Sequence, residues 1–105
     1  MPRPPFDPNS ITSRQRRALR GLAHALEPTV QVGHAGITDA VVAAVKRALL
    51  DHELVKVRLH EPEDKKAMAQ ALATATMSAL CGLVGHTVII YRPHPKEPKL
   101  QIPAA

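Results

Sequence analysis

The spacing of apolar residues changes along the chain, and the first change follows a helix-like segment. From about residue 12 to Leu26, apolar side chains recur every three or four positions, as on the buried side of a helix. Thr12 and Gln15 have the spacing of a capping box, which predicts the start of this helix, and Pro28 predicts its end. Residues 29–32 then alternate apolar and polar positions and predict a short strand.

The middle of the chain repeats this change from helical spacing to alternation. Thr38 can cap a second helix that runs to about Asp51, with Val45 and Leu49 on its inner face. In Leu54–His60, apolar residues alternate with basic ones. This period of two is typical of a strand with one buried face.

The last third predicts one more helix, followed by strand. A proline and three acids at 61–64 favour a helix start, and an alanine-rich helix is expected to reach about Leu80. We interpret Gly82 as the C-cap of this helix and Gly85 as a bulge or tight-packing position. A strand is then expected within Leu83–Arg92.

These elements define a fold. With a last short strand at 100–102, the order is α-β-α-β-α-β-β, and the crossover between the first two strands favours parallel pairing. We predict an α/β (α+β) fold: one compact domain over residues 11–103, with a mixed sheet of about four strands and three helices. Residues 1–10, rich in proline and arginine, predict a flexible leader.

Positive charge is concentrated at the two ends of the chain. The first twenty residues hold five arginines and one acid, the last fourteen hold three cations and one acid, and the net charge is +5. A basic excess of this kind attracts polyanions through its field and through counterion release. Phe6 and Tyr91 are the only aromatic residues, so phosphate contacts are favoured over stacking of bases.

Several function classes find no support in the sequence. No apolar run approaches the ~20 residues of a membrane span, and the single Cys81 cannot form an internal disulfide, so we expect a cytoplasmic protein with no membrane partner. The six histidines show no short-spaced ligand pair, and no serine or cysteine has a nucleophile setting. We predict that the protein is not an enzyme and uses no metal, cofactor or small-molecule substrate.

The segment VQVGHAGIT places Gly33 and Gly36 between a strand and a helix. The first amides of a helix have no partner within it and attract anions, and residues without Cβ let a phosphate come close. The GxxG loop of KH domains works in this way. A plain turn explains the same two glycines, and Gly82 and Gly85 repeat the spacing, while the motifs of nucleotide-binding loops are missing.

Basic residues accompany this loop in the sequence. At 100° per residue, one side of the first helix carries Arg14, Arg16, Arg17 and Arg20. A solvated helix face explains them equally simply, but their clustering favours RNA. Lys56 and Arg58 on the second strand and Arg92 after the last one are further candidates.

Three stretches, LRGLAHALEPTVQVGHAGIT, DHELVKVR and GHTVIIYRP, resemble in order and spacing the single-domain bacterial YhbY-type proteins, which carry the CRM (chloroplast RNA splicing and ribosome maturation) domain. The resemblance covers residues 11–103. It implies a compact α/β domain whose KH-like GxxG loop contacts RNA, and an association with precursors of the large ribosomal subunit. By position, it assigns the loop to Gly33–Gly36, a basic flank to the first helix, and Lys56 and Arg92 to the other two motifs. Ala35 offers no side-chain contact, and His86 stands where a lysine is common.

We therefore predict a protein that binds ribosomal RNA in precursors of the large subunit and assists ribosome assembly. A helix N-terminal phosphate clamp, flanked by the arginines of the first helix, is the expected mechanism. The predicted RNA-binding residues are Gly33, His34, Ala35, Gly36, Thr38, Arg14, Arg16, Arg17, Arg20, Lys56, Arg58 and Arg92. The alternative is a protein-interaction module that docks on a ribosomal protein or assembly factor through the same surface.

Overall fold

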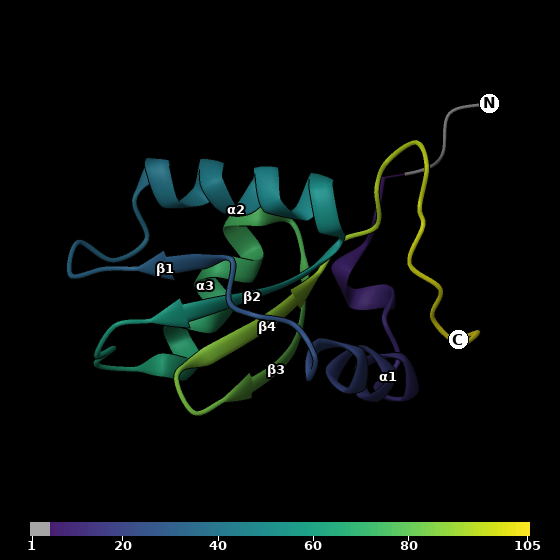
Figure 1. Ribbon diagram of the computed structural model, residues 1–105, viewed down its shortest axis with the longest axis horizontal. Coiled ribbons are helices and arrows are strands. Elements are labelled where there is room, and N and C mark those ends of the chain that lie inside the picture. Colours follow the sequence, from purple (N-terminus) through teal and green to yellow (C-terminus); the bar gives the residue numbers. More distant parts are fainter. Residues whose placement is uncertain (1–4) are drawn as a thin grey trace.

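A four-stranded mixed sheet with helices on both faces forms the body of the protein (Figure 1). The computed structural model describes residues 5–105, and the strand order in the sheet is β1-β2-β4-β3. In chain order, the elements are the 3-10 helix η1 (Pro8–Ser10), α1 (Ser13–Ala23), β1 (Val30–Val32), α2 (Asp39–His52), β2 (Leu54–Leu59), α3 (Lys65–Thr76), β3 (Ala79–Val84) and β4 (Thr87–Tyr91).

The register of the sheet fixes which ends of the strands lie together. β1 runs parallel to β2, as the crossover through α2 predicts, and Val32 lies opposite Leu59. β4 is antiparallel to both of its neighbours, and Tyr91 lies opposite Leu54 in β2 and Ala79 in β3. One end of the sheet therefore holds the C-terminal ends of β1 and β2, and the other holds the end of β4.

Each face of the sheet has its own core. The alternating residues Val55, Val57 and Leu59 of β2 pack against α2 and α3 in the larger cluster. Leu54 points to the opposite face and joins a second cluster with Leu19 of α1. The alternation in β2 correctly predicts that Val55, Val57 and Leu59 share one buried face. On the opposite face of β2, the second cluster covers only the end at Leu54.

Local signals set the helix starts as the sequence predicts. Thr12 and Gln15 form the complete capping box of α1, and the Thr38 hydroxyl accepts a hydrogen bond from the Val41 amide at the start of α2. The end of α1 was misplaced, since the helix stops at Ala23 and not at Leu26.

The third helix and the strands after it differ from the prediction. α3 ends at Thr76, because Met77 adopts a left-handed conformation (φ 55°) and its amide bonds back to the carbonyls of Ala73 and Thr74. The following residues form β3, which begins four residues earlier than expected. Gly82 is thus not a helix cap but lies in β3 beside a register shift, and Gly85 (φ 60°) occupies the β3–β4 turn.

The C-terminal segment is not a strand. Three of its amides bind Glu53, whose carboxylate accepts hydrogen bonds from the backbone of His94 (2.8 Å), Lys99 (2.9 Å) and Leu100 (2.9 Å). Leu100 and Ile102 then pack against the cluster under α1. Residues 92–103 are therefore held by the Glu53 carboxylate, by a hydrogen bond from Gln15 Nε2 to the Pro103 carbonyl (2.9 Å) and by apolar packing, in place of a sheet ladder.

Residues near the N-terminus contact the body of the protein. The ring of Phe6 meets Tyr91 edge to face, with centroids 5.9 Å apart, and Ile11 is buried. Asp7 caps η1 through the amide of Asn9. Of the leader expected over residues 1–10, residues 1–4 lie outside the described residues, and its flexibility stays a prediction.

Candidate nucleic-acid interface

The GxxG loop forms a tight turn at the C-terminal end of β1. The Gly36 amide donates to the Gly33 carbonyl at 3.1 Å, and Gly36 has φ +75°, a conformation that favours glycine. The amide of Thr38 then donates to the Gly36 carbonyl, and α2 begins. The strand–turn–helix arrangement expected from the sequence is present.

The outer surface of this loop is open. A Cβ atom placed on Gly33 or Gly36 would have no atom within 4 Å beyond those of the glycine and its chain neighbours. Within residues 5–105, the amides of His34, Ala35 and Ile37 make no hydrogen bond. Unpaired backbone donors therefore lie in the loop that leads into α2, as an anion site requires.

One side of the loop is acidic, which the sequence did not reveal. A cleft of about 580 Å³ separates the loop from the β2–α3 connection, and its far wall carries Glu61, Glu63 and Asp64. Asp39 adds a further carboxylate in the first turn of α2. These four acids repel a polyanion on this side, although Asp64 also caps α3 as a helix-start signal should.

The other side of the loop faces the sheet and carries a cation. Gln31 lies opposite Arg58 in the register of β1 and β2, two positions before Gly33. Arg58 is exposed and lines a second cleft of about 370 Å³ together with His60 and His86. A phosphate that approaches the loop from this side meets Arg58, although Glu61 also lines this cleft.

The arginines of α1 divide into two pairs. Arg16 donates from Nε to the Leu80 carbonyl at 3.2 Å, and Arg20 donates from Nη1 to the Cys81 carbonyl at 2.9 Å. Both bonds cover the free edge of β3 beside its register shift. Arg14 and Arg17, by contrast, are exposed and make no hydrogen bond or ion pair within the part of the chain that is described.

The arginines of α1 do not flank the loop directly. α1 packs over the Leu54 end of β2, whereas the loop follows β1 beside Leu59 (Figure 1). The six residues of β2 span about 17–20 Å at ~3.3 Å per residue. Lys56 and Arg58 lie between these ends on the face that α1 shares, because they alternate in step with Leu54.

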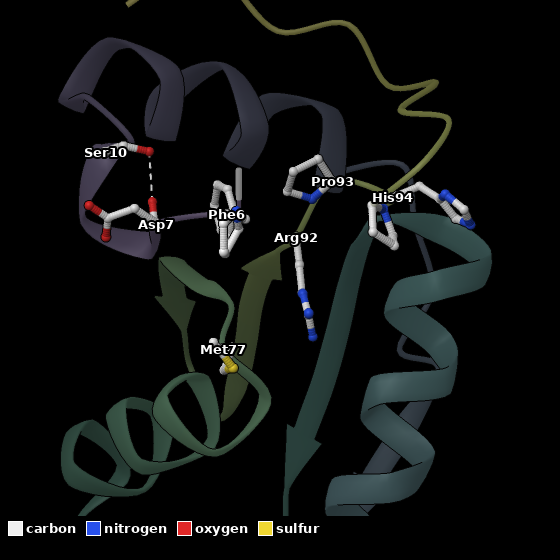
Figure 2. Close-up of a pocket in the computed structure, with 9 residues that line it drawn as sticks. Phe6, Asp7, Ser10, Met77, Arg92, Pro93 and His94 are labelled. Carbon is white, nitrogen blue, oxygen red and sulfur yellow. Dashed lines mark hydrogen bonds between the residues drawn. The ribbon is translucent and has the colours of Figure 1, made fainter. Parts of the chain in front are cut away.

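Two predicted cations are engaged within the fold. Lys56 is half-buried and donates from Nζ to the Leu26 carbonyl at 3.0 Å. Arg92 donates from Nη1 to the Thr76 carbonyl at the end of α3, at 3.2 Å. It lines a cavity of about 680 Å³ beside Phe6 and Met77, at the end of the sheet away from the loop (Figure 2).

The remaining titratable side chains are placed as follows. Cys81 is buried as predicted, and burial raises the pKa of its thiol to about 11 in spite of the nearby charges of Arg16 and Arg20. His34 and His60, far apart in the sequence, meet edge to face with ring centroids 4.3 Å apart. Among residues 5–105, no three His, Cys, Asp or Glu side chains form a group that could hold a metal ion, and no helix is long and apolar enough to cross a membrane.

The fold and the loop define the class: a small α/β domain with an exposed GxxG turn at a strand–helix junction. A family model described as the CRS1 / YhbY (CRM) domain matches residues 11–92. The chain belongs to the CRS1/YhbY (CRM) domain family.

Similar proteins match the chain over nearly its whole length. It is 36% identical over 96 residues to a protein of Haemophilus influenzae named RNA-binding protein, covering 90% of this chain and 96% of that one. It is 34% identical to YqeI of Bacillus subtilis, covering 89% and 99% of the two chains. The solution structure of SAV1595 from Staphylococcus aureus has a TM-score of 0.77 and 34% identity, again with 89% and 99% covered.

Proposed function

We propose that this protein binds RNA through the GxxG loop, approached from the sheet side. The observation that carries the proposal is the open outer surface of Gly33 and Gly36 at the end of β1, the strand whose Gln31 lies opposite Arg58. The unpaired amides of the loop would donate hydrogen bonds to one phosphate, and the guanidinium of Arg58 would pair with a neighbouring one. The protein named RNA-binding protein in Haemophilus influenzae supports the same ligand.

The remaining cations would extend this contact along the sheet. Lys56 lies next on the same face of β2, and the exposed Arg14 and Arg17 lie on α1 beyond it. An RNA segment that follows these residues would be held by its phosphates, because Tyr91 is buried and Phe6 is at the far end of the sheet. Recognition would then depend on the shape of the RNA more than on its bases.

The ligand that we propose is ribosomal RNA in precursors of the large ribosomal subunit, where the protein would assist assembly in the cytoplasm without catalysing a reaction. The resemblance to YhbY-type proteins supports this choice. The matching test is sedimentation of a lysate: the protein should travel with immature large subunits, and crosslinking of those fractions should recover ribosomal RNA. A position only at the top of the gradient would contradict the proposal.

Salt dependence separates RNA binding from docking on a protein. Each phosphate contact should contribute a slope of about −0.7 to −0.9 in log K against log salt concentration. Contacts by the loop, Arg58, Lys56 and the two exposed arginines of α1 predict a steep slope in titrations with labelled RNA. Binding to a ribosomal protein alone, with a flat salt response and no RNA binding, would favour the protein-interaction alternative.

A further inference from the structure

A second cleft lies at the C-terminal ends of β1 and β2, and His60 on its wall contacts His34 of the GxxG loop. Its volume is about 370 Å³, and Gln31, Arg58, His60 and His86 contribute to its walls together with Glu61. These side chains come from β1, β2, the end of β2 and the β3–β4 turn. Arg58 is the only one of these that the sequence predicts to bind RNA, so the cleft adds polar side chains outside the predicted set.

The backbone holds the members of this cleft in place. The Leu59 amide donates to the His86 carbonyl at 2.7 Å, and the His60 amide donates to the Val32 carbonyl at 3.0 Å. The ring of His60 also meets the ring of His34 from the GxxG loop at 4.3 Å between centroids. The histidines are therefore tied to the sheet and to the loop, while their rings stay exposed.

The charge of the cleft depends on these histidines. With neutral imidazoles, the single positive charge of Arg58 is balanced by Glu61, whose Oε2 lies 3.9 Å from Nε2 of His60. Protonation of His60 and His86 would add two positive charges, and His34 would add one more at the loop. The other acids near the loop, Glu63, Asp64 and Asp39, belong to the opposite cleft and to the first turn of α2.

We propose that this cleft is a second phosphate subsite, which takes the RNA phosphate next to the one at the GxxG loop. The inference rests on the proposed RNA binding and extends it. Arg58 supplies the permanent charge, Gln31 supplies a neutral donor, and His60 and His86 supply ring N–H donors that are cationic when protonated. Glu63 and Asp64, which line only the opposite cleft, would repel the RNA on the other side of the loop, so the RNA would reach the loop across the sheet.

The test measures binding of a fluorescein-labelled oligouridylate by anisotropy, at constant ionic strength, at about pH 8 and about pH 6. The ratio of the affinity at about pH 6 to that at about pH 8 should be about tenfold for the wild-type protein. His86→Gln and His60→Gln should each reduce this affinity ratio to about threefold. The matched control is His52→Gln, on the exposed end of α2, which should leave the ratio unchanged.

Arg58→Gln provides the complementary measurement, because its charge does not titrate in this range. It should weaken binding at both pH values about tenfold and leave the ratio in place. If His60→Gln and His86→Gln both keep the wild-type ratio while the wild-type protein binds RNA, the subsite is wrong and the loop proposal stands. If the wild-type protein does not bind the RNA at either pH, RNA binding through the loop is itself wrong.

Discussion

Arg20 lies across Gly82 at the free edge of the sheet. A Cβ atom on Gly82 would lie 2.7 Å from Cδ and 3.1 Å from Cγ of Arg20, and the Arg20 guanidinium donates to the neighbouring Cys81 carbonyl. Glycine at this position lets the side chain of α1 pass close to the strand. The pair therefore joins α1 to the edge of the sheet.

Replacement of Gly82 should displace Arg20 and break its hydrogen bond. We expect Gly82→Ala to lower the free energy of unfolding by about 1 kcal/mol, and Arg20→Ala to do the same. Because both changes remove one contact, the double variant should lose clearly less than the sum. Urea unfolding of the four proteins measures this coupling.

The control is Gly21→Ala, within α1, where a Cβ has no atom within 4 Å. Alanine should stabilise the helix there by about 0.5–1 kcal/mol, the opposite sign. Strictly additive losses for Gly82→Ala and Arg20→Ala would show that the two residues act independently.

Local signals and distant contacts explain what the sequence could predict. Thr12 and Thr38 cap their helices through residues three positions away, so their roles are readable in the chain. The role of Gly82 is set by Arg20, and the Arg20 hydrogen bond to Cys81 spans 61 positions. Local sequence alone therefore predicts a helix cap for this glycine, which follows an alanine-rich segment. Apolar residues on both faces of β3 also hide its alternation.

The candidate site shows the same contrast between features set by neighbouring residues and features set by distant contacts. The strand, turn and helix around Gly33 and Gly36 were predicted from consecutive residues. The acidic wall at Glu61 and the pairing of His34 with His60 were not, because they depend on how the β2–α3 connection folds beside the loop. The sequence shows that arginines cluster on α1. It does not show that Arg16 binds the Leu80 carbonyl on the edge strand β3.

Glu53 is a second feature that the sequence did not reveal, since its partners lie 41 to 47 positions later. Burial alone would raise the pKa of its carboxyl, but hydrogen bonds from three amides and the nearby charge of His94 lower the pKa below its ordinary value of 4.5. Glu53 also has φ 64°, a strained backbone conformation that its hydrogen bonds to the C-terminal segment maintain.

Glu53→Gln should destabilise the protein and flatten its response to acid. Its amide group would turn a second donor toward the amide of His94 or of Lys99, so we expect a loss of about 2 kcal/mol at pH 7. Because the folded pKa is lowered, the stabilisation by Glu53 is present above pH 4.5 and is lost as the pH falls through the folded value. Urea unfolding between about pH 7 and about pH 3 should show the two proteins converging in stability. A difference in the free energy of unfolding that stays the same over this pH range would contradict the role of the Glu53 carboxylate.

The two pairs of arginines on α1 should respond differently to substitution. Arg14→Gln/Arg17→Gln removes exposed charges, so the salt slope of RNA binding should become shallower by up to about 1.4–1.8, with stability unchanged within about 0.5 kcal/mol. Arg16→Gln/Arg20→Gln removes two hydrogen bonds to β3 and should lower the free energy of unfolding by about 2 kcal/mol. Equal effects of both double variants on stability would contradict this division.

Gly33 allows a test of the loop that leaves the backbone unstrained. Gly36 has φ +75°, so any side chain there is strained, whereas Gly33 has open space and no positive φ. Gly33→Asp adds a carboxylate where the phosphate is expected and should weaken binding of labelled RNA at least tenfold. Gly33→Ala adds bulk alone and should have a smaller effect.

The matched control for the added charge is Ala44→Asp, on the exposed side of α2, which changes the net charge equally. Its effect on RNA binding should be small, because the new charge lies beyond the first turn of α2 and is screened by salt. Circular dichroism should show that all three variants fold. If Gly33→Asp and Ala44→Asp weaken binding to the same extent, the loop responds only to net charge, and the RNA backbone does not contact it.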